Sequence, residues 1–267
     1  MSLQRILYVA SEVAPFLETS LVASCLRKLP EAMQHKQLDV RIIVPKFGVI
    51  HDRLNRLHEV LRLSGNIVSI DAAAYAITVK VSTIPNVRLQ VYFVDNEALF
   101  GCRKAVFQDT SNYFFADNDL RMIFFCMGVM ETLKKLEWEA DVVHCHGWIT
   151  SLLPLFWKKL YQQHALFTKA KLITTLYNTT YSNHFPLLAN RIEKIGISAE
   201  DMALLATGNF CNIIELAMQY SDLVLRGEML NEAEFEKLPK AQACLLVPND
   251  EQYSARCLAL YHELLGE

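Results

Sequence analysis

The chain has 267 residues, of which 52% are hydrophobic and 21% are charged, and its formal net charge is −3. This length is enough for one large α/β domain, and the composition is typical of a folded globular protein rather than a disordered one. A slightly acidic chain without a basic cluster has no general attraction for nucleic acid or for an anionic membrane surface, so the charge excludes both classes of partner.

Seven cysteines are scattered along the chain, and none of them are spaced as Cys-x-x-Cys. Most lie in apolar stretches, where cysteine behaves as a small core residue, which favours a reducing compartment over a disulfide-bonded secreted scaffold. The N-terminus shows no signal-peptide pattern. The longest apolar stretch, 122–130, is far shorter than the ~20 residues of a membrane-spanning helix. We therefore expect a soluble, cytoplasmic protein.

The first third of the chain alternates between strand and helix patterns. Residues 6–10 form a short apolar run that is typical of a strand buried on both faces. Residues 21–35 carry apolar side chains at helical spacing, and a second apolar run at 40–44 completes a βαβ unit. This order favours a parallel sheet with helices on its faces.

Residues 58–85 interrupt the alternation. Three segments, 59–63, 66–70 and 76–84, show two-residue periodicity, which predicts a β meander or a long hairpin inserted in the sheet. A strand at 89–94 resumes the core of the sheet.

The remainder returns to alternating elements, beginning with a long helix over 117–136 for which Asp117 or Asn118 is a good N-cap. The later elements expected are a strand from 141, a helix at 152–161, strands at 172–176, 223–225 and 244–247, and a helix at 250–265 that packs through Tyr253, Cys257, Leu260, Tyr261 and Leu264. The pattern predicts a single α/β domain over 1–267, with a Rossmann-like, doubly wound, mostly parallel sheet.

The opening strand and the loop after it carry the most informative motif. Residues 5–15 read RILYVASEVAP, the loop continues through Glu18, Thr19 and Ser20, and PKFG stands at 45–48. This opening resembles the start of the glycogen and bacterial starch synthase family. In that family a Lys-Thr-Gly-Gly loop, with an Asp a few residues later, approaches the donor ADP-glucose.

Three later segments extend the resemblance in the same order and at similar spacing. They read VDNEALFGCR at 94–103, DNDLRMIFF at 117–125 and DVVHCHGWITSLLP at 141–154. Together the motifs cover about the first two-thirds of the chain. The resemblance implies the N-terminal domain of a GT-B glycosyltransferase, in which donor and catalytic groups lie in a cleft between two Rossmann-like domains. Nothing after residue 183 resembles the second domain, which supplies most of the nucleotide pocket.

The chain departs from the family's pattern at positions that face the donor. Glu18 puts negative charge where a Lys would hydrogen-bond a pyrophosphate, and side chains at the glycine positions hinder close approach of the backbone to phosphate. Losing one such donor alone slows transfer by ~10²-fold or more, so the pattern predicts no useful transfer. The replacements are Glu18 for Lys, Ser20 and Leu21 for the two Gly, Ser24 for Asp, Gly147 for the Asp after His-x-His, and Tyr177 for the His of a Thr-x-His-Asn turn.

The candidate ligand-binding residues are those that keep the family's pattern or stand beside it at strand ends. We name no catalytic residue, no metal and no cofactor. The candidates are Glu12, Thr19, Ser20, His144, His146, Trp148, Tyr177 and Asn178.

Several of these residues also have a purely structural interpretation. His144 and His146 share one strand face and could suggest a metal site, but no third ligand of suitable spacing is nearby, so a buried pair is favoured. Trp148 could stack on a sugar, although packing is the commoner role of such a residue. Helix capping explains the acidic run 117–119 better than catalysis does.

Two functions from different classes remain open, besides a scaffold that binds no sugar. The first is a non-catalytic binding or regulatory module of glucan metabolism, with ADP-glucose, an α-glucan or a partner protein as its ligand. The alternative is an active glucosyltransferase that transfers glucose from ADP-glucose to an α-1,4-glucan. That alternative requires a partner subunit or a homodimer to complete the cleft, and it predicts an exposed apolar patch at the carboxyl edge of the sheet.

Overall fold

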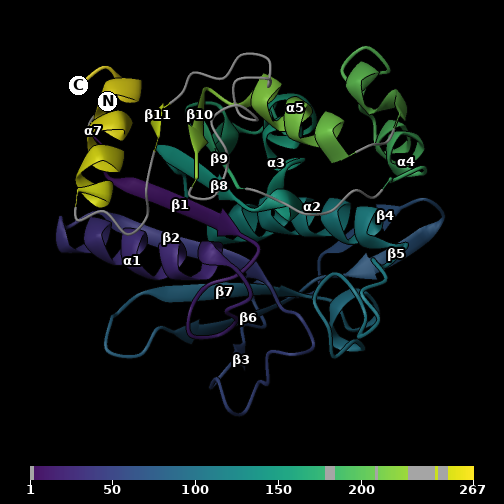
Figure 1. Cartoon of the computed structure of the whole chain (residues 1–267), viewed down its shortest axis with the longest axis horizontal. Coiled ribbons are helices and arrows are strands. Elements are labelled where there is room, and N and C mark those ends of the chain that lie inside the picture. Colours follow the sequence, from purple (N-terminus) through teal and green to yellow (C-terminus); the bar gives the residue numbers. More distant parts are fainter. Residues whose placement is uncertain (1–2, 178–183, 208–209, 228–243, 246–251) are drawn as a thin grey trace.

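A nine-stranded, mostly parallel sheet forms the centre of the computed structural model, which describes residues 3–177, 184–207, 210–227, 244–245 and 252–267 (Figure 1). Among the described strands of this sheet, the pairs made by β6 are antiparallel, with β7 on one side and with β3 on the other, and the other pairs are parallel. In spatial order the strands are β11 (Cys244–Leu245), β10 (Leu223–Arg226), β9 (Lys171–Leu176), β8 (Val142–His146), β1 (Arg5–Ala10), β2 (Asp39–Pro45), β7 (Gln90–Asp95), β6 (Thr78–Thr83) and β3 (His58–Glu59).

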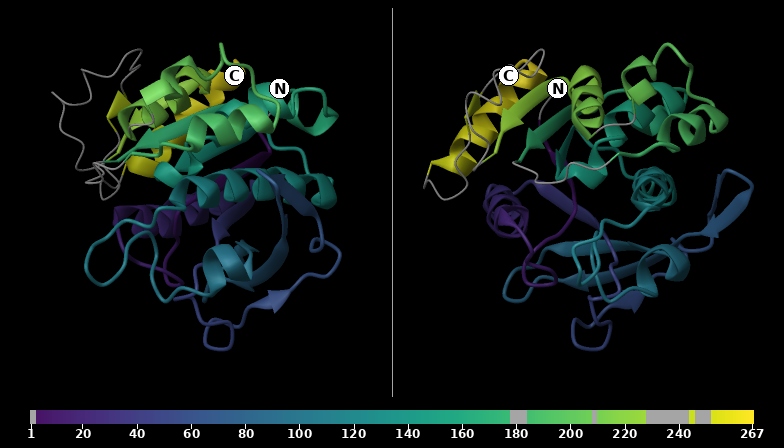
Figure 2. Two further views of the ribbon diagram at one scale, coloured as in Figure 1. Left: turned by 90° about the vertical axis from the view of Figure 1, so that its right-hand side faces the viewer. Right: turned by 45° about the vertical axis from the view of Figure 1, so that its right-hand side comes forward.

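Helices cover both faces of this sheet, as a doubly wound fold requires. Helices α1 (Leu21–His35) and α7 (Tyr253–Leu265) contact each other on one face, and α2 (Asn118–Leu136) and α5 (Phe210–Tyr220) lie on the other (Figure 2). The shorter helices are α3 (Leu153–Leu155), which continues into a π-helical turn at Phe156–Leu160, and α4 (Leu188–Lys194).

The central strands are buried on both faces because helices cover both sides of the sheet. In β1, every residue from Ile6 to Ala10 is buried. All five residues of β8 are buried as well. In β8 the alternation sends His144 and His146 toward α1 and α7. Cys145 faces the other side, where it lies near Cys126 of α2. The predicted strands and helices of the first βαβ unit, and the long helix over 117–136, are confirmed.

The β-rich insertion is present, but its strands do not form one continuous meander or hairpin in the sheet. Its strand β6 joins the main sheet, and β4 (Ile67–Ile70) pairs with β5 (Ala73–Ala76) as a separate hairpin. Residues 60–63 form turns instead of a strand. Leu61 is 80% exposed and Leu63 is 1% exposed, so these two residues cannot occupy one face of a half-buried strand.

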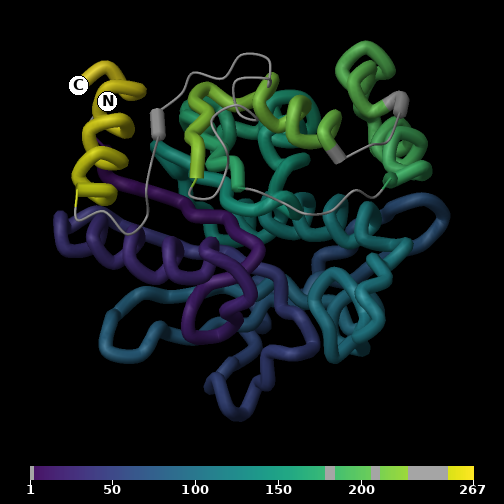
Figure 3. The backbone as a smooth tube through the Cα atoms, in the orientation of Figure 1, coloured from purple at the N-terminus to yellow at the C-terminus, as the bar shows by residue number. Residues whose placement is uncertain are grey.

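The two ends of the chain lie near one another, beside α7, in every view (Figure 3). The last helix forms as expected over most of its predicted length, and Tyr253, Cys257 and Tyr261 on its inner face are buried. Of the strand expected at 244–247, the first two residues form β11 and the others lie outside the described residues. Among the described helices, none has the length and apolar character needed to cross a bilayer.

Candidate functional site

The sheet changes direction between β1 and β8. Strands β2 and β7 follow β1 on one side, and β8, β9 and β10 follow on the other. In open α/β sheets ligands bind at the carboxyl ends of the strands at such a switch point. The two strand ends are joined there, because the backbone N–H of Ser11 donates to the carbonyl of His146 at 3.1 Å. The fold therefore places the sequence candidates after β1 and β8 at the position where this class of fold binds ligands.

Gly147, which stands where the resemblance expects Asp, has a structural requirement of its own. Its φ of +83° belongs to the region that favours glycine. A Cβ atom at this position would lie 2.6 Å from Oγ of Ser11, closer than non-bonded atoms approach. The loss of the acidic side chain is therefore tied to the close crossing of the two strand ends.

Glu12 is the residue that organises the altered loop. Its carboxylate is 3% exposed and accepts hydrogen bonds from the Thr19 backbone N–H at 2.5 Å, from the Thr19 hydroxyl at 2.9 Å and from the Ser20 hydroxyl. Burial raises the pKa of Glu12, and the hydrogen bonds from Ser20 and Thr19 oppose that rise. Glu12 therefore fixes the loop from within the protein.

Ser20 closes the amino end of α1. It is the N-cap residue, with an extended backbone, and its side-chain oxygen accepts from the Val22 N–H at 3.2 Å. A helix amino end with free N–H groups is a natural anion site. Here the Ser20 hydroxyl and the Glu12 carboxylate already satisfy donors at this end, and Glu18 and Thr19 beside it are exposed. An incoming phosphate would meet both a capped helix end and negative charge.

His144 is wholly buried between two hydroxyl groups. Its Nδ1 lies 2.7 Å from the Tyr261 hydroxyl oxygen in α7, and its Nε2 lies 2.7 Å from Oγ1 of Thr175 in β9. Burial, together with the neighbouring His146, holds the pKa of His144 well below its usual range. Both ring nitrogens are thus engaged, and the ring stays neutral at physiological pH.

His146 lies one step nearer the carboxyl edge, and its ring centroid is 4.0 Å from that of His144. Its Nδ1 is 2.7 Å from the hydroxyl oxygen of Tyr177, the residue that replaces the expected His. Burial lowers the pKa of His146 to about 3. Its Nε2 atom is buried and has no hydrogen-bond partner among the described residues. Asn178, the remaining candidate after β9, lies outside the described residues.

Trp148 follows Gly147 and is 4% exposed. Its ring lies 4.6 Å from that of Phe107, 5.7 Å from that of Phe114 and 5.9 Å from that of Phe185, measured between centroids. This surround favours the packing interpretation of Trp148 over sugar stacking.

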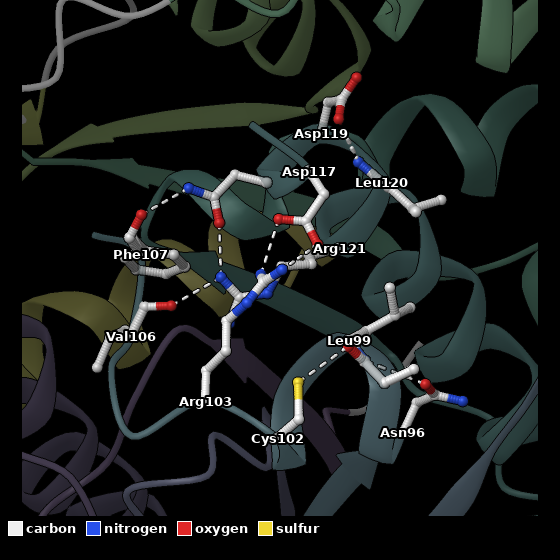
Figure 4. A network of polar contacts seen from close by, with 12 residues as sticks. Asn96, Leu99, Cys102, Arg103, Val106, Phe107, Asp117, Asp119, Leu120 and Arg121 are labelled. Atoms are coloured by element: carbon white, nitrogen blue, oxygen red, sulfur yellow. Dashed lines mark hydrogen bonds and ion pairs between the residues drawn. The ribbon is translucent and has the colours of Figure 1, made fainter. Parts of the chain in front are cut away.

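The acidic run at the start of α2 caps the helix only in part, because Asp119 accepts a hydrogen bond from the Leu120 N–H of the first turn at 2.7 Å whereas Asp117 and Asn118 have other partners. Asp117 occupies the N-cap position without a side-chain cap, because its carboxylate pairs with both terminal nitrogens of Arg103 at 2.7 and 2.8 Å (Figure 4). The Asn118 side-chain oxygen accepts from Arg121 at 2.6 Å, and Asp119 pairs with Arg191 of α4. These polar groups hold the loop between β7 and α2 in place.

Arg121 is the centre of that arrangement. Its guanidinium is fully buried, donates to the Val106 carbonyl at 2.7 Å (Figure 4), and lies over the rings of Phe47 and Phe100 at 5.3 and 4.9 Å. Burial lowers the pKa of Arg121 to about 10. The motif around this residue therefore builds the scaffold beside the site rather than the site itself.

Sequence reasoning missed the partners that complete the histidine pair. They are Thr175 of β9 and Tyr261 of α7, which bond His144, and Tyr8 of β1, whose ring lies beside both histidines. The four-residue spacing of Tyr253, Cys257 and Tyr261 was visible and was interpreted as packing alone. The polar nature of all three residues was the signal that could have indicated more. Within the described residues, no three potential metal ligands gather.

The starch synthase catalytic domain family matches residues 5–226. This chain belongs to that family. A glycogen synthase from Chlorobium luteolum is 35% identical over 239 residues, which cover 84% of this chain and 48% of that protein. A glycogen synthase from Chlorobium limicola is 34% identical over 221 residues, covering 82% and 45%. The chain therefore spans about half the length of the curated relatives it matches.

A solved structure shares the fold. The catalytic domain of starch synthase IV from Arabidopsis thaliana, bound to ADP and acarbose, superposes with a TM-score of 0.67 at 21% identity and covers 84% of this chain and 45% of that chain. The expected family and the expected fold class, a Rossmann-like α/β sheet corresponding to one domain of a GT-B enzyme, are confirmed. Helix α7 follows the segment that the family matches.

Proposed function

We propose that this chain is a binding or regulatory module of glucan metabolism that does not transfer glucose by itself. The main support for this proposal is the Glu12 carboxylate. It accepts hydrogen bonds from the N–H and the hydroxyl of Thr19 and from the hydroxyl of Ser20. By resemblance, this loop is where an active synthase approaches the phosphates of ADP-glucose. A loop whose donors face a buried carboxylate offers little stabilisation to a leaving diphosphate.

The histidine pair supports the same proposal. By resemblance, Tyr177 stands where the family has the His that faces the glucose, and its hydroxyl meets Nδ1 of His146, whose ring burial keeps neutral. Tyr177 therefore fills space that the family leaves to a smaller His and its substrate. The ligands proposed for the module are ADP-glucose or an α-glucan bound without turnover, or a partner protein.

The test combines binding with activity. Isothermal titration of the purified chain with ADP-glucose, and then with maltoheptaose, measures whether either ligand binds. Transfer of labelled glucose from ADP-glucose to glycogen is followed in parallel, with the Chlorobium luteolum glycogen synthase as the positive control. We expect no transfer by this chain at concentrations where the control is active. Transfer above the blank would refute the proposal.

The alternative is an active glucosyltransferase that a partner subunit or a second copy completes. The observation that favours it is a pair of exposed apolar side chains, Tyr113 at 71% and Leu187 at 54% exposure. Their sequence neighbours Phe114 and Phe185 pack on Trp148, which follows β8 at the carboxyl edge. Such exposure suits a surface that another domain covers. If a dimer is the active form, transfer activity per chain rises with protein concentration, in step with the dimer fraction measured by light scattering.

A further inference from the structure

The inner face of helix α7 carries polar groups where a packing helix usually carries aliphatic ones. Tyr253, Cys257 and Tyr261 follow one another at intervals of four residues, so they form one stripe along the helix. Their exposed fractions are 3%, 0% and 0%. The half-buried Leu260 and Leu264 flank the stripe. The docking of α7 therefore uses two phenols and a thiol as well as the aliphatic contacts of Leu258, Leu260, Leu264 and Leu265.

These groups connect α7 directly to the candidate site. The Tyr261 hydroxyl lies 2.7 Å from Nδ1 of His144 and 3.2 Å from the Tyr8 hydroxyl. The His144 ring in turn stacks beside His146, whose Nδ1 meets Tyr177. A continuous series of contacts therefore runs from the middle of α7 to the carboxyl edge of the sheet.

A second connection joins α7 to α1. The Tyr253 hydroxyl is 3.0 Å from Sγ of Cys25, which is fully buried in α1. The two helices also contact one another. The amino end of α1 is the end that Ser20 caps and Glu12 holds. Helix α7 thus touches both halves of the site, the histidine pair and the helix that carries the altered loop.

The stability of α7 comes from this docking. The helix has 13 residues, which is marginal for an isolated helix in water, and its N-cap residue Gln252 makes no side-chain cap. When α7 leaves the sheet, water can hydrogen-bond its phenols and the His144 Nδ1 that it uncovers. Release of α7 therefore requires less free energy than release of the central strands, whose backbone bonds and apolar faces are all enclosed.

We propose that α7 is a detachable latch over the histidine pair. In the docked state Tyr261 holds His144, and through the stacked rings His146 stays against Tyr177. In the released state the face formed by Tyr8, His144 and Thr175 opens to solvent while the sheet remains folded. A ligand that uses His146 then shifts the balance between the two states by its difference in affinity for them. Docking and release of α7 do not require that the site binds ADP-glucose.

Four buried cysteines allow a direct test on the intact chain. Cys257 lies on the inner face of α7 and Cys25 lies in α1 against Tyr253 of α7, whereas Cys126 and Cys145 lie on the opposite side of the sheet, and all four are fully buried and reduced. The native protein is incubated with iodoacetamide, and modification of each cysteine is followed by peptide mass spectrometry. We expect Cys25 and Cys257 to react at least about tenfold faster than Cys126 and Cys145, because local opening is more frequent than global unfolding. Equal rates for all four would overturn the proposal.

A pair of matched variants tests the role of Tyr261. Tyr261→Phe removes the hydroxyl that holds His144, and it is expected to raise the rate at Cys257 and Cys25 further while the rate at Cys126 is unchanged. The control is Tyr161→Phe, which removes a hydroxyl bonded to Glu131 on the α2 side. Faster labelling of all four cysteines in Tyr261→Phe, or the same selective effect in the control, would contradict a latch.

Nitrogen chemical shifts of the imidazoles link the latch to the site. In Tyr261→Phe the His144 ring gains access to water, so its pKa is expected to rise toward the ordinary value, and the His146 signals are expected to shift with it. Unchanged signals from both rings would show that α7 does not position the histidine pair, and the proposal would fail.

Discussion

Nδ1 of His144 lies 2.7 Å from the hydroxyl oxygen of Tyr261, although 117 residues separate the two in the sequence. The contact places a phenol of the last helix on a histidine that the family motif brings to the switch point of the sheet. The other nitrogen of the same ring meets Thr175. A fully buried imidazole is tolerated there because both of its nitrogens have partners.

Removing one of those partners should destabilise the protein measurably. Thr175→Val keeps the shape of the side chain but leaves Nε2 of His144 without a hydrogen-bond partner in the core. We expect a loss of about 1–3 kcal/mol in the free energy of unfolding, the usual range for an unsatisfied buried polar group. Urea denaturation monitored by fluorescence measures it.

The control for this variant is Thr168→Val at an exposed turn, where the hydroxyl bonds only the nearby Ala165 carbonyl. Its expected effect is below about 0.5 kcal/mol, as for most surface substitutions. A loss of the same size at both positions would mean that the His144 bond adds nothing to stability.

The lowered pKa values of the two histidines predict a loss of stability in mild acid. Both rings are neutral in the folded protein, and His146 stays so down to about pH 3. An unfolded histidine binds a proton near pH 6.5, so below that pH the unfolded chain binds more protons than the folded chain does. Stability therefore falls as the pH decreases, by about 1.4 kcal/mol per pH unit for each ring.

The contribution of one ring is obtained by comparing two variants. In His146→Gln the dependence of the unfolding free energy on pH should be weaker than in the parent, by a difference that grows below pH 6.5 and approaches ~1.4 kcal/mol per unit toward pH 5. His51→Gln, at an exposed histidine, controls for the chemical change from histidine to glutamine. Glu12 acts in the opposite direction because its pKa is raised, but its contribution cancels in the comparison. An unchanged slope in His146→Gln would show that this histidine is not held neutral.

The restored loop is a test of the site's chemistry. The combined variant Glu18→Lys, Ser20→Gly and Leu21→Gly rebuilds the Lys-Thr-Gly-Gly sequence of the family. Lysine adds a charge-assisted contact to phosphate, and glycine lets the backbone approach it. We expect ADP-glucose to bind at least about tenfold more tightly than to the parent chain, a gain of about 1.4 kcal/mol that weakens with added salt.

The matched control replaces only a distant exposed residue, as in Glu59→Lys, which changes the net charge by the same amount at β3. Tighter binding in that control would indicate general electrostatic attraction. No gain in the restored loop would show that Glu12 and Tyr177, rather than the loop sequence, keep the donor out.

The sequence predicted the order of the elements because their signals are local. Residues 21–35 show helical spacing of apolar residues, and this span coincides with α1. The family motifs likewise placed His144, His146 and Gly147 at one strand end. What could not be predicted is which side chains meet across the fold. Tyr261 and Tyr177 reach the histidines only because α7 packs on a face of the sheet and β9 pairs with β8, and no local pattern encodes that contact.

Two other residues show why the site was only partly predicted. Glu12 was selected for its place after a strand, but its hydrogen bonds to Thr19 and Ser20 depend on the path of the loop between them. Asp117 or Asn118 was expected to cap α2, and Asp117 does occupy the N-cap position, but its carboxylate pairs with Arg103. A capping pattern fails when a stronger partner for the carboxylate approaches from another part of the chain.

Gly147 allows a prediction that separates crowding from backbone strain. Gly147→Ala adds a Cβ atom 2.6 Å from Oγ of Ser11 to a residue with φ of +83°. Gly65 has a similar φ of +89°, but nothing lies within 4 Å of its Cβ position. Gly65→Ala should therefore cost about 1 kcal/mol from strain alone, and Gly147→Ala should cost about 2–4 kcal/mol. Thermal and urea denaturation of the two variants measure the difference.

Adding Ser11→Gly to Gly147→Ala removes the clashing hydroxyl. The double variant should therefore lose no more stability than Gly65→Ala does. If it recovers nothing, the crossing of β1 and β8 is not what requires glycine, and the missing Asp at this position has no structural explanation.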